Sequence, residues 1–234
     1  MKNNALLLLL TLVTGSLLAA DSDPRNDVTT AARKLAQQGN YSWKSTIEFG
    51  NFNGGTEGKI DKGLIGLSMA FGENKTEAFL KGGQGAVKPQ DEDWQSLSEL
   101  AAAAGTEPGP KMFLVRRLQS FKAPAEEATD LASKTKELKK DGDIYSGELT
   151  EAGAKELLSV GFRRGSNAAE PKNAKGTVKF WLKDGSLSKY QLNLQGTVNF
   201  NGEDRDIDRT TTYQIKDLGT TKVEIPEAAK KKLS

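Results

Sequence analysis

The last third of the chain alternates between apolar and polar residues, and this pattern constrains the fold more than any other feature of the sequence. Successive side chains on a β-strand point to opposite faces, so a period of two predicts strands with one buried face. Turn sequences at residues 184–185 and 201–202 divide the pattern into three strands. The positions of the buried series are Val178, Phe180, Leu182, Tyr190, Leu192, Leu194, Val198, Phe200, Thr211, Tyr213 and Ile215. We therefore expect an antiparallel sheet that is wet on one face and covered on the other.

The same period of two occurs earlier in the chain and predicts a second group of strands. Its first strand has the apolar positions Tyr41, Trp43, Ile47 and Phe49. A turn at residues 53–55 is expected to follow, because glycines and asparagine favour chain reversal. Further strands are expected at residues 56–61, 64–71 and 76–81. The short glycine-containing links between them favour antiparallel hairpins.

Helical periodicity precedes and separates the two groups of strands. Val28, Ala31, Ala32 and Leu35 follow the spacing of one helix face, and Gly39 marks the end of that helix. Residues 90–131 are rich in helix-forming residues and predict a helical insertion. A short helix is expected after Thr150, which can cap it, and residues 161–175 are expected to form a loop. The predicted fold class is α+β, with an N-terminal helix and a helical insertion.

Residues 1–20 have the order of a cleavable signal peptide: a charged start, an apolar block and a stretch of small residues. Cleavage after Ala20 is expected, which leaves a single domain over residues 21–234. Leu18 stands where a small residue is usual, so cleavage after Ala19 or a retained anchor stays open. The apolar block is shorter than a membrane span, and no later segment is long and apolar enough to be one. We expect a soluble periplasmic or secreted protein.

Composition excludes several classes of function. The chain contains no cysteine and no histidine, which removes disulfides, thiolate sites, Ser-His-Asp catalysis and most zinc and copper chemistry. A formal net charge of +2, from 33 basic and 31 acidic residues, lacks the basic excess typical of nucleic-acid binders. Hydrolysis by paired carboxylates alone is the remaining catalytic alternative, but no pair stands out from the surface charge. We expect no enzyme activity, no cofactor and no nucleic-acid partner.

Short charged or glycine-rich motifs are better explained by structure than by chemistry. Carboxylates at 91–93 fit the start of a helix, whose dipole favours negative charge, better than a metal site. Residues 201–208 lack the closing glutamate of a calcium loop and fit a hairpin turn. The glycines of 82–85 fit a turn and no phosphate loop. Arginine pairs at 116–117 and 163–164 are read as exposed pairs, with an anionic head group as the alternative ligand. No metal site is expected.

The order of elements resembles the periplasmic lipoprotein-carrier superfamily, which includes LolA, LolB, LppX and LprG. The stretches that carry the likeness are residues 31–47, residues 145–158, the strand pair after Lys175 and residues 213–226. The resemblance implies an incompletely closed antiparallel β half-barrel, whose concave face is covered by the N-terminal helix and the helical insertion. In such proteins the covered face encloses acyl chains. The anchoring cysteine of the lipoprotein members is missing here, which makes the chain more like the soluble carrier.

The resulting hypothesis is an extracytoplasmic carrier or binding protein for a lipid or other hydrophobic ligand. Movement of a helical lid around residues 105–124 would govern release. The residues predicted to bind the ligand are Trp43, Ile47, Phe49, Leu67, Met69, Phe180, Leu192, Leu194 and Tyr213. Period two alone leaves open whether they line a cavity or fill a core. The alternative function is a non-catalytic envelope interaction protein that uses the same fold as a scaffold for a protein partner.

Overall fold

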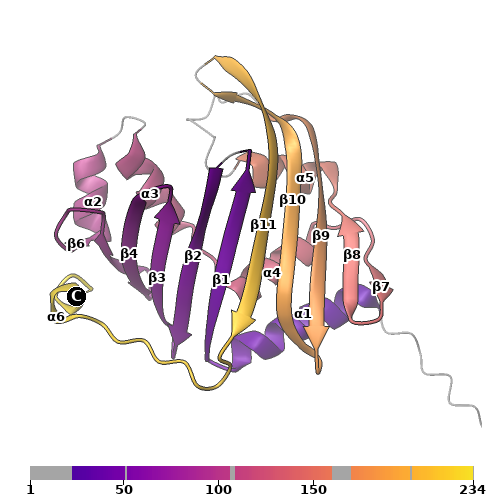
Figure 1. The fold of residues 1–234 in the computed structure, drawn as a ribbon, viewed down its shortest axis with the longest axis horizontal. Helices are drawn as coiled ribbons and strands as arrows, with labels where there is room; N and C mark the ends of the chain where they lie inside the picture. Colours follow the sequence, from indigo (N-terminus) through magenta and orange to yellow (C-terminus); the bar gives the residue numbers. More distant parts are fainter. Residues whose placement is uncertain (1–22, 51, 106–108, 160–169, 201, 234) are drawn as a thin grey trace, which may run out of the picture.

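The computed structural model describes residues 23–50, 52–105, 109–159, 170–200 and 202–233. Within these stretches the chain forms one antiparallel sheet of eleven strands and six helices, so the α+β class is confirmed (Figure 1). No helix in the described stretches combines the length and apolarity needed to cross a bilayer. The predicted signal peptide and the arginine pair at 163–164 lie outside the described residues, as do parts of the predicted loop 161–175 and lid 105–124.

The sheet is open, and the first strand in the chain, β1, pairs with the last one, β11, in the middle of the sheet. Strands are β1 (Asn40–Phe49), β2 (Phe52–Asp61), β3 (Leu64–Phe71), β4 (Asn74–Lys81), β5 (Gln84–Lys88), β6 (Gln95–Ser96), β7 (Lys139–Asp141), β8 (Ile144–Glu148), β9 (Lys172–Lys183), β10 (Ser186–Phe200) and β11 (Glu203–Lys216). Their order across the sheet is β6-β5-β4-β3-β2-β1-β11-β10-β9-β8-β7, with β6 and β7 at the edges. The β1–β11 pair therefore joins the two groups of strands into one sheet.

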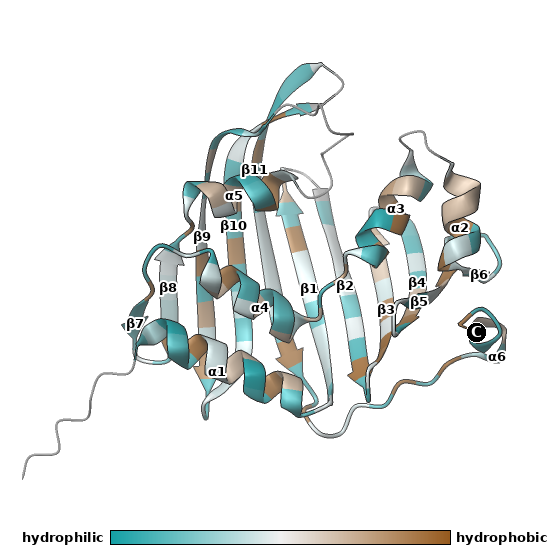
Figure 2. Ribbon diagram, turned by 180° about the vertical axis from the view of Figure 1, so that it is seen from behind, coloured by the Kyte–Doolittle hydropathy of each residue, from teal (hydrophilic) through white to brown (hydrophobic). Residues whose placement is uncertain are grey.

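The helices cover one face of the sheet in two groups. They are α1 (Pro24–Gln37), α2 (Leu97–Ala104), α3 (Pro110–Gln119), α4 (Pro124–Ser133), α5 (Glu151–Ser159) and α6 (Glu227–Lys230). Helices α1, α4 and α5 lie over the end that contains β8 to β10, whereas α2 and α3 lie at the end that contains β3 to β6 (Figure 2). After β11 the chain runs as an extended segment to α6 beside β5.

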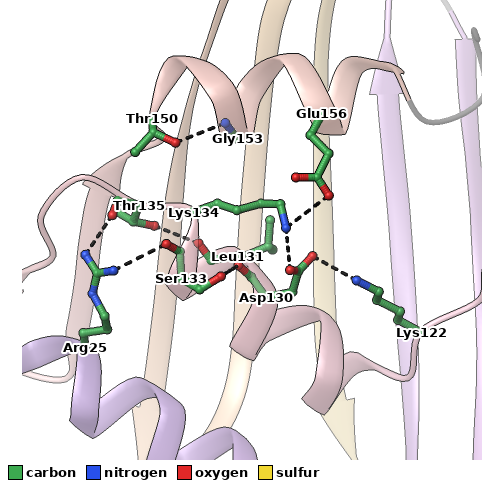
Figure 3. Close-up of polar contacts among 10 residues, drawn as sticks. All are labelled: Arg25, Lys122, Asp130, Leu131, Ser133, Lys134, Thr135, Thr150, Gly153 and Glu156. Atoms are coloured by element: carbon green, nitrogen blue, oxygen red, sulfur yellow. Dashed lines mark hydrogen bonds and ion pairs between the residues drawn. The ribbon is translucent and has the colours of Figure 1, made fainter.

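Helix α1 forms as its apolar spacing predicted, because its four buried residues are the four of the predicted face. Asp23 caps its first turn by accepting a hydrogen bond from the Arg25 amide, and Pro24 occupies its first position. The Arg25 side chain donates to the backbone carbonyls of Ser133 and Thr135 at the end of α4 (Figure 3). It also donates to the carbonyl of Lys136. Helix ends leave carbonyls without intrahelical partners, so this guanidinium ties α1 to the end of α4.

An ion-pair network joins α4 to α5 beside this contact. Lys134 lies between Asp130 of α4 and Glu156 of α5, and Lys122 also donates to Asp130 (Figure 3). The Lys134 side chain is only 13% exposed, so its charge requires these partners more than a surface lysine would. The basic stretch that begins at Lys134, interpreted from the sequence as solvated surface, therefore starts with a residue that connects two helices.

Three sequence predictions about local structure are wrong. Residues 53–55 do not turn but lie within β2, where a Cβ at Gly55 would overlap the Ser45 carbonyl of β1. Glycine there allows two backbones to approach closely. Residues 84–88 form β5, so only the first two glycines of 82–85 make the turn. Strand β9 already begins at Lys172, inside the predicted loop.

The acidic residues 91–93 precede α2 instead of starting it. Ser96 caps α2, and its side chain and that of Glu99 form a reciprocal capping box. Glu92 pairs with Lys111 of α3, and this hydrogen-bonded contact lowers the pKa of Glu92. The described residues contain no group of three histidine, cysteine or acidic side chains arranged to hold a metal.

Candidate functional site

All nine residues predicted to bind a ligand share the helix-covered face of the sheet. In antiparallel pairs, directly opposite residues point to the same face, and the register links them across the strands. Trp43, Leu67, Met69, Phe180, Leu192 and Leu194 are buried in the hydrophobic core. Ile47 and Tyr213 are partly buried, and Phe49 is 37% exposed. That these side chains contact a ligand stays a prediction.

The end of the sheet that contains β9 and β10 is filled by its own side chains. Phe180, Tyr190 and Leu194 have no solvent exposure, and they belong to the same core as the buried residues of α1 and α4. Helix α1 contacts both strands, and α5 contacts both from the other side of α4. The predicted residues on these two strands, Phe180, Leu192 and Leu194, therefore lie in this core.

The centre of the sheet has a different lining. Ser45 of β1, Thr56 of β2 and Thr211 of β11 are short and polar, yet all three are buried on the covered face. Beside them the Trp43 ring stacks on Phe121, with ring centroids 6.2 Å apart. Trp43 also occupies the space that a Cβ would need at Gly58. Phe121 belongs to the segment between α3 and α4, which therefore packs against the central strand β1.

A carboxylate lies over this centre. Glu127 of α4 accepts a hydrogen bond of 2.8 Å from the hydroxyl of Tyr190, and the Tyr213 hydroxyl also hydrogen-bonds to it. The rings of the two tyrosines are stacked, with centroids 4.5 Å apart and an interplanar angle of 10°. Burial raises the pKa of Glu127, although the tyrosine hydroxyls and the charge of Arg209 partly oppose that effect.

Two guanidinium groups complete a polar cluster on the covered face, which we name the arginine–tyrosine cluster: Arg117, Glu127, Tyr190, Arg209 and Tyr213. Arg117 of α3 lies 4.4 Å above the centroid of the Phe71 ring, and its Nη2 atom is 3.5 Å from Thr56 Oγ1. Arg209 of β11 lies opposite Phe49 of β1. Its Nε is the only buried side-chain nitrogen or oxygen in the described residues without a hydrogen-bond partner.

The arginines of this cluster are electrostatically unfavourable where they lie. Burial lowers the pKa of both Arg117 and Arg209, and the charge of Arg209 lowers the pKa of Arg117 further, while the charge of Glu127 partly opposes these effects on both. Among the described residues no carboxylate forms an ion pair with either group. Burial also raises the pKa of Tyr41 to about 12. The cluster therefore carries positive charge that its own residues do not pair.

Sequence reasoning found part of this cluster. The sequence interprets residues 116–117 as an exposed arginine pair, which is correct for Arg116 and wrong for the partly buried Arg117. Arg209 and Glu127 were missed. Arg209 alternates in step with Ile207, Thr211 and Tyr213, so it lies on the same face of β11 as they do. A charged residue at a position of the buried series could have indicated it from the sequence.

A separate groove lies at the far end of the sheet, around β8 to β10. Its volume is about 770 Å³. The residues around it are Lys136, Glu148, Leu149, Glu151, Asn173, Ala174, Lys175, Gly176, Thr177, Asn193 and Gln195. Most of these side chains are polar or charged, so the groove does not have the apolar lining expected for acyl chains.

Comparison with known proteins gives no match: no protein-family model fits the chain, and no curated protein is similar to it. The functional argument therefore depends on the chain's own geometry.

Proposed function

We propose that this chain is an extracytoplasmic carrier or binding protein for a lipid or another hydrophobic ligand, and that it acts without catalysis. The ligand would lie on the covered face of an incompletely closed half-barrel, between the two groups of helices. The signal-peptide pattern of residues 1–20 supports the location outside the cytoplasm.

The observation that carries the proposal is the divided helix cover over an open sheet. Helices α1 and α5 contact β9 and β10, and α4 packs against α1, whereas α2 contacts β5 and β6 and packs against α3. Between these groups the covered face carries short side chains at Ser45, Thr56 and Thr211, flanked by aromatic rings. A sheet filled only for stability would be expected to carry large apolar side chains at such central positions.

The segment between α3 and α4 is the part of the cover that would move. It places Phe121 on Trp43, and it links the two groups of helices over β1. Displacing Phe121 would expose the Trp43 ring and the short side chains beside it to an incoming apolar chain. Release would reverse this step, so the ligand would be bound in a reversible equilibrium.

Extraction of the protein tests the proposal. The mature protein is purified from its native envelope without detergent, extracted with organic solvent and analysed by mass spectrometry. A chain-bearing lipid in near-stoichiometric amount is expected. Thr56→Phe should reduce the extracted lipid by filling the centre, whereas Glu57→Phe, on the opposite face, should not. Repeatedly empty extracts, together with a captured envelope protein, would contradict lipid binding and favour the interaction role.

A further inference from the structure

We propose that Arg117 and Arg209 together bind the anionic head group, a carboxylate or a phosphate, of an amphiphilic ligand. This inference rests on the proposed function, because it assumes that the apolar part of the ligand lies on the covered face of the sheet. It adds a chemical class of ligand and names the two residues that select it.

The donors of the two guanidiniums are the first part of the argument. Arg209 Nε is buried without a hydrogen-bond partner in the described part of the chain, and leaving such a donor unpaired is costly. The Arg117 side chain makes one hydrogen bond there, to Thr56 Oγ1, at the long distance of 3.5 Å. Several N–H groups therefore remain to bind an oxygen anion at this place.

The charge balance is the second part. Glu127 is the carboxylate of the cluster, but its oxygens accept hydrogen bonds from Tyr190 and Tyr213, and it forms no ion pair with either arginine within the described residues. Both guanidiniums are partly buried, and Glu127 acts on them only through the field of its charge and not through an ion pair. Like charges that are partly removed from water without an ion-pair partner are unfavourable. An anion bound between them would supply the missing charge and accept the free N–H groups.

The surroundings indicate an amphiphile and not a bare ion. Arg117 lies on the Phe71 ring, and Arg209 lies in the register between Phe49 of β1 and Leu194 of β10. Each guanidinium therefore has an apolar side chain as a neighbour. The planar guanidinium group can bind both carboxylate and phosphate through two hydrogen bonds. The proposal therefore specifies an anionic oxygen head group of either kind.

Three probes with one chain length, and inorganic phosphate without a chain, separate these contributions. The delipidated mature protein is titrated in a calorimeter with dodecanoate, dodecyl phosphate, 1-dodecanol and inorganic phosphate. Dodecanoate or dodecyl phosphate should bind at least about tenfold more tightly than 1-dodecanol, because charge-assisted hydrogen bonds to a partly buried arginine strengthen binding by that order. Inorganic phosphate alone should bind more weakly than dodecyl phosphate.

Substitutions assign the effect to the two arginines. Arg209→Met and Arg117→Met should each remove most of the preference for the charged probe and leave the affinity for 1-dodecanol within about threefold. Arg209→Lys keeps the charge but loses the fork, and it should retain part of the preference. The matched control is Arg205→Met, because this arginine is on the same strand, and its exposed side chain pairs with Glu203. Circular dichroism verifies that each variant is folded.

The outcomes separate this inference from the proposed function. Equal binding of dodecanoate, dodecyl phosphate and 1-dodecanol to the wild type overturns the inference and leaves a neutral-lipid carrier. No binding of any chain-bearing probe overturns both. If inorganic phosphate binds as tightly as dodecyl phosphate, the site binds free anions, and the claim that its ligand is an amphiphile is wrong. A charge preference that survives both methionine substitutions overturns the assignment to Arg117 and Arg209.

Discussion

The β9 and β10 end of the covered face is built differently from its centre. At this end, Val178 and Phe180 are completely buried in a core shared with α1, α4 and α5. In the centre, short polar side chains of β1, β2 and β11 lie beside a guanidinium that has an unpaired buried donor. One region satisfies the rules of a packed core, and the other does not. Such departures are expected where a structure serves binding instead of stability.

The largest effect is expected from a core deletion at the packed end. Phe180→Ala should reduce the free energy of unfolding by about 3–5 kcal/mol, because it leaves a cavity among fully buried neighbours. Phe71→Ala, beneath Arg117 and only partly buried, should cost clearly less. Urea unfolding of both variants measures the difference. Equal losses would show that the two regions are packed alike.

A substitution at Gly58 tests the close contact that holds Trp43. Gly58→Ala should destabilise the protein by about 1–3 kcal/mol, because the new Cβ would overlap the indole ring. Gly109→Ala is the matched control, since no atom lies within 4 Å of its added Cβ. Thermal unfolding compares the two variants. A neutral Gly58→Ala would mean that the ring moves freely, which would weaken the case for an ordered stack on Phe121.

Loss of Arg25 tests how firmly α4 is anchored to the packed end. Arg25→Ala removes hydrogen bonds to three carbonyls after α4 and should cost about 1–2 kcal/mol. Arg33→Ala, an exposed residue of the same helix, should change stability by less than about 0.5 kcal/mol. Hydrogen exchange should show faster exchange in α4 for Arg25→Ala alone. Unchanged exchange would place the anchor of α4 elsewhere.

The smallest effect is a change in pH dependence at the arginine–tyrosine cluster. Burial raises the pKa of Glu127 above its ordinary 4.5, so its contribution to stability is complete below pH 4.5 and is lost as pH rises through the raised pKa. Tyr190, Tyr213 and Arg209 face the carboxyl and are also present in the folded state. Glu127→Gln keeps an oxygen that accepts a hydrogen bond but cannot ionise.

The stability of Glu127→Gln relative to the wild type should therefore increase as pH rises above 4.5. Unfolding midpoints at several pH values measure the difference, and Glu126→Gln, exposed on the same helix, serves as control. A relative stability that falls as pH rises would show that the ionised carboxylate is the favoured form, held by the arginine charges.

The strands of the last third could be predicted because their alternation is strict and their turns carry glycine. The start of β2 could not, because the glycine at 55 looks like a turn residue until the Ser45 backbone is seen beside it. The pairing of β1 with β11 joins residues far apart in the sequence, which local patterns do not encode. The arginine–tyrosine cluster could not be predicted for the same reason. Arg117 and Arg209 are far apart in the sequence, and their charges interact only because of that strand pairing and the packing of the helices.

The central claim is that the middle of the covered face is built for a ligand, and the unfolding free energy of lipid-free Arg209→Met tests it most directly. Replacing a partly buried guanidinium, whose buried Nε donor is unpaired, with an apolar side chain of similar length should stabilise the ligand-free protein by about 1–3 kcal/mol. A loss of stability of that size would show that Arg209 is a structural residue and would contradict the account.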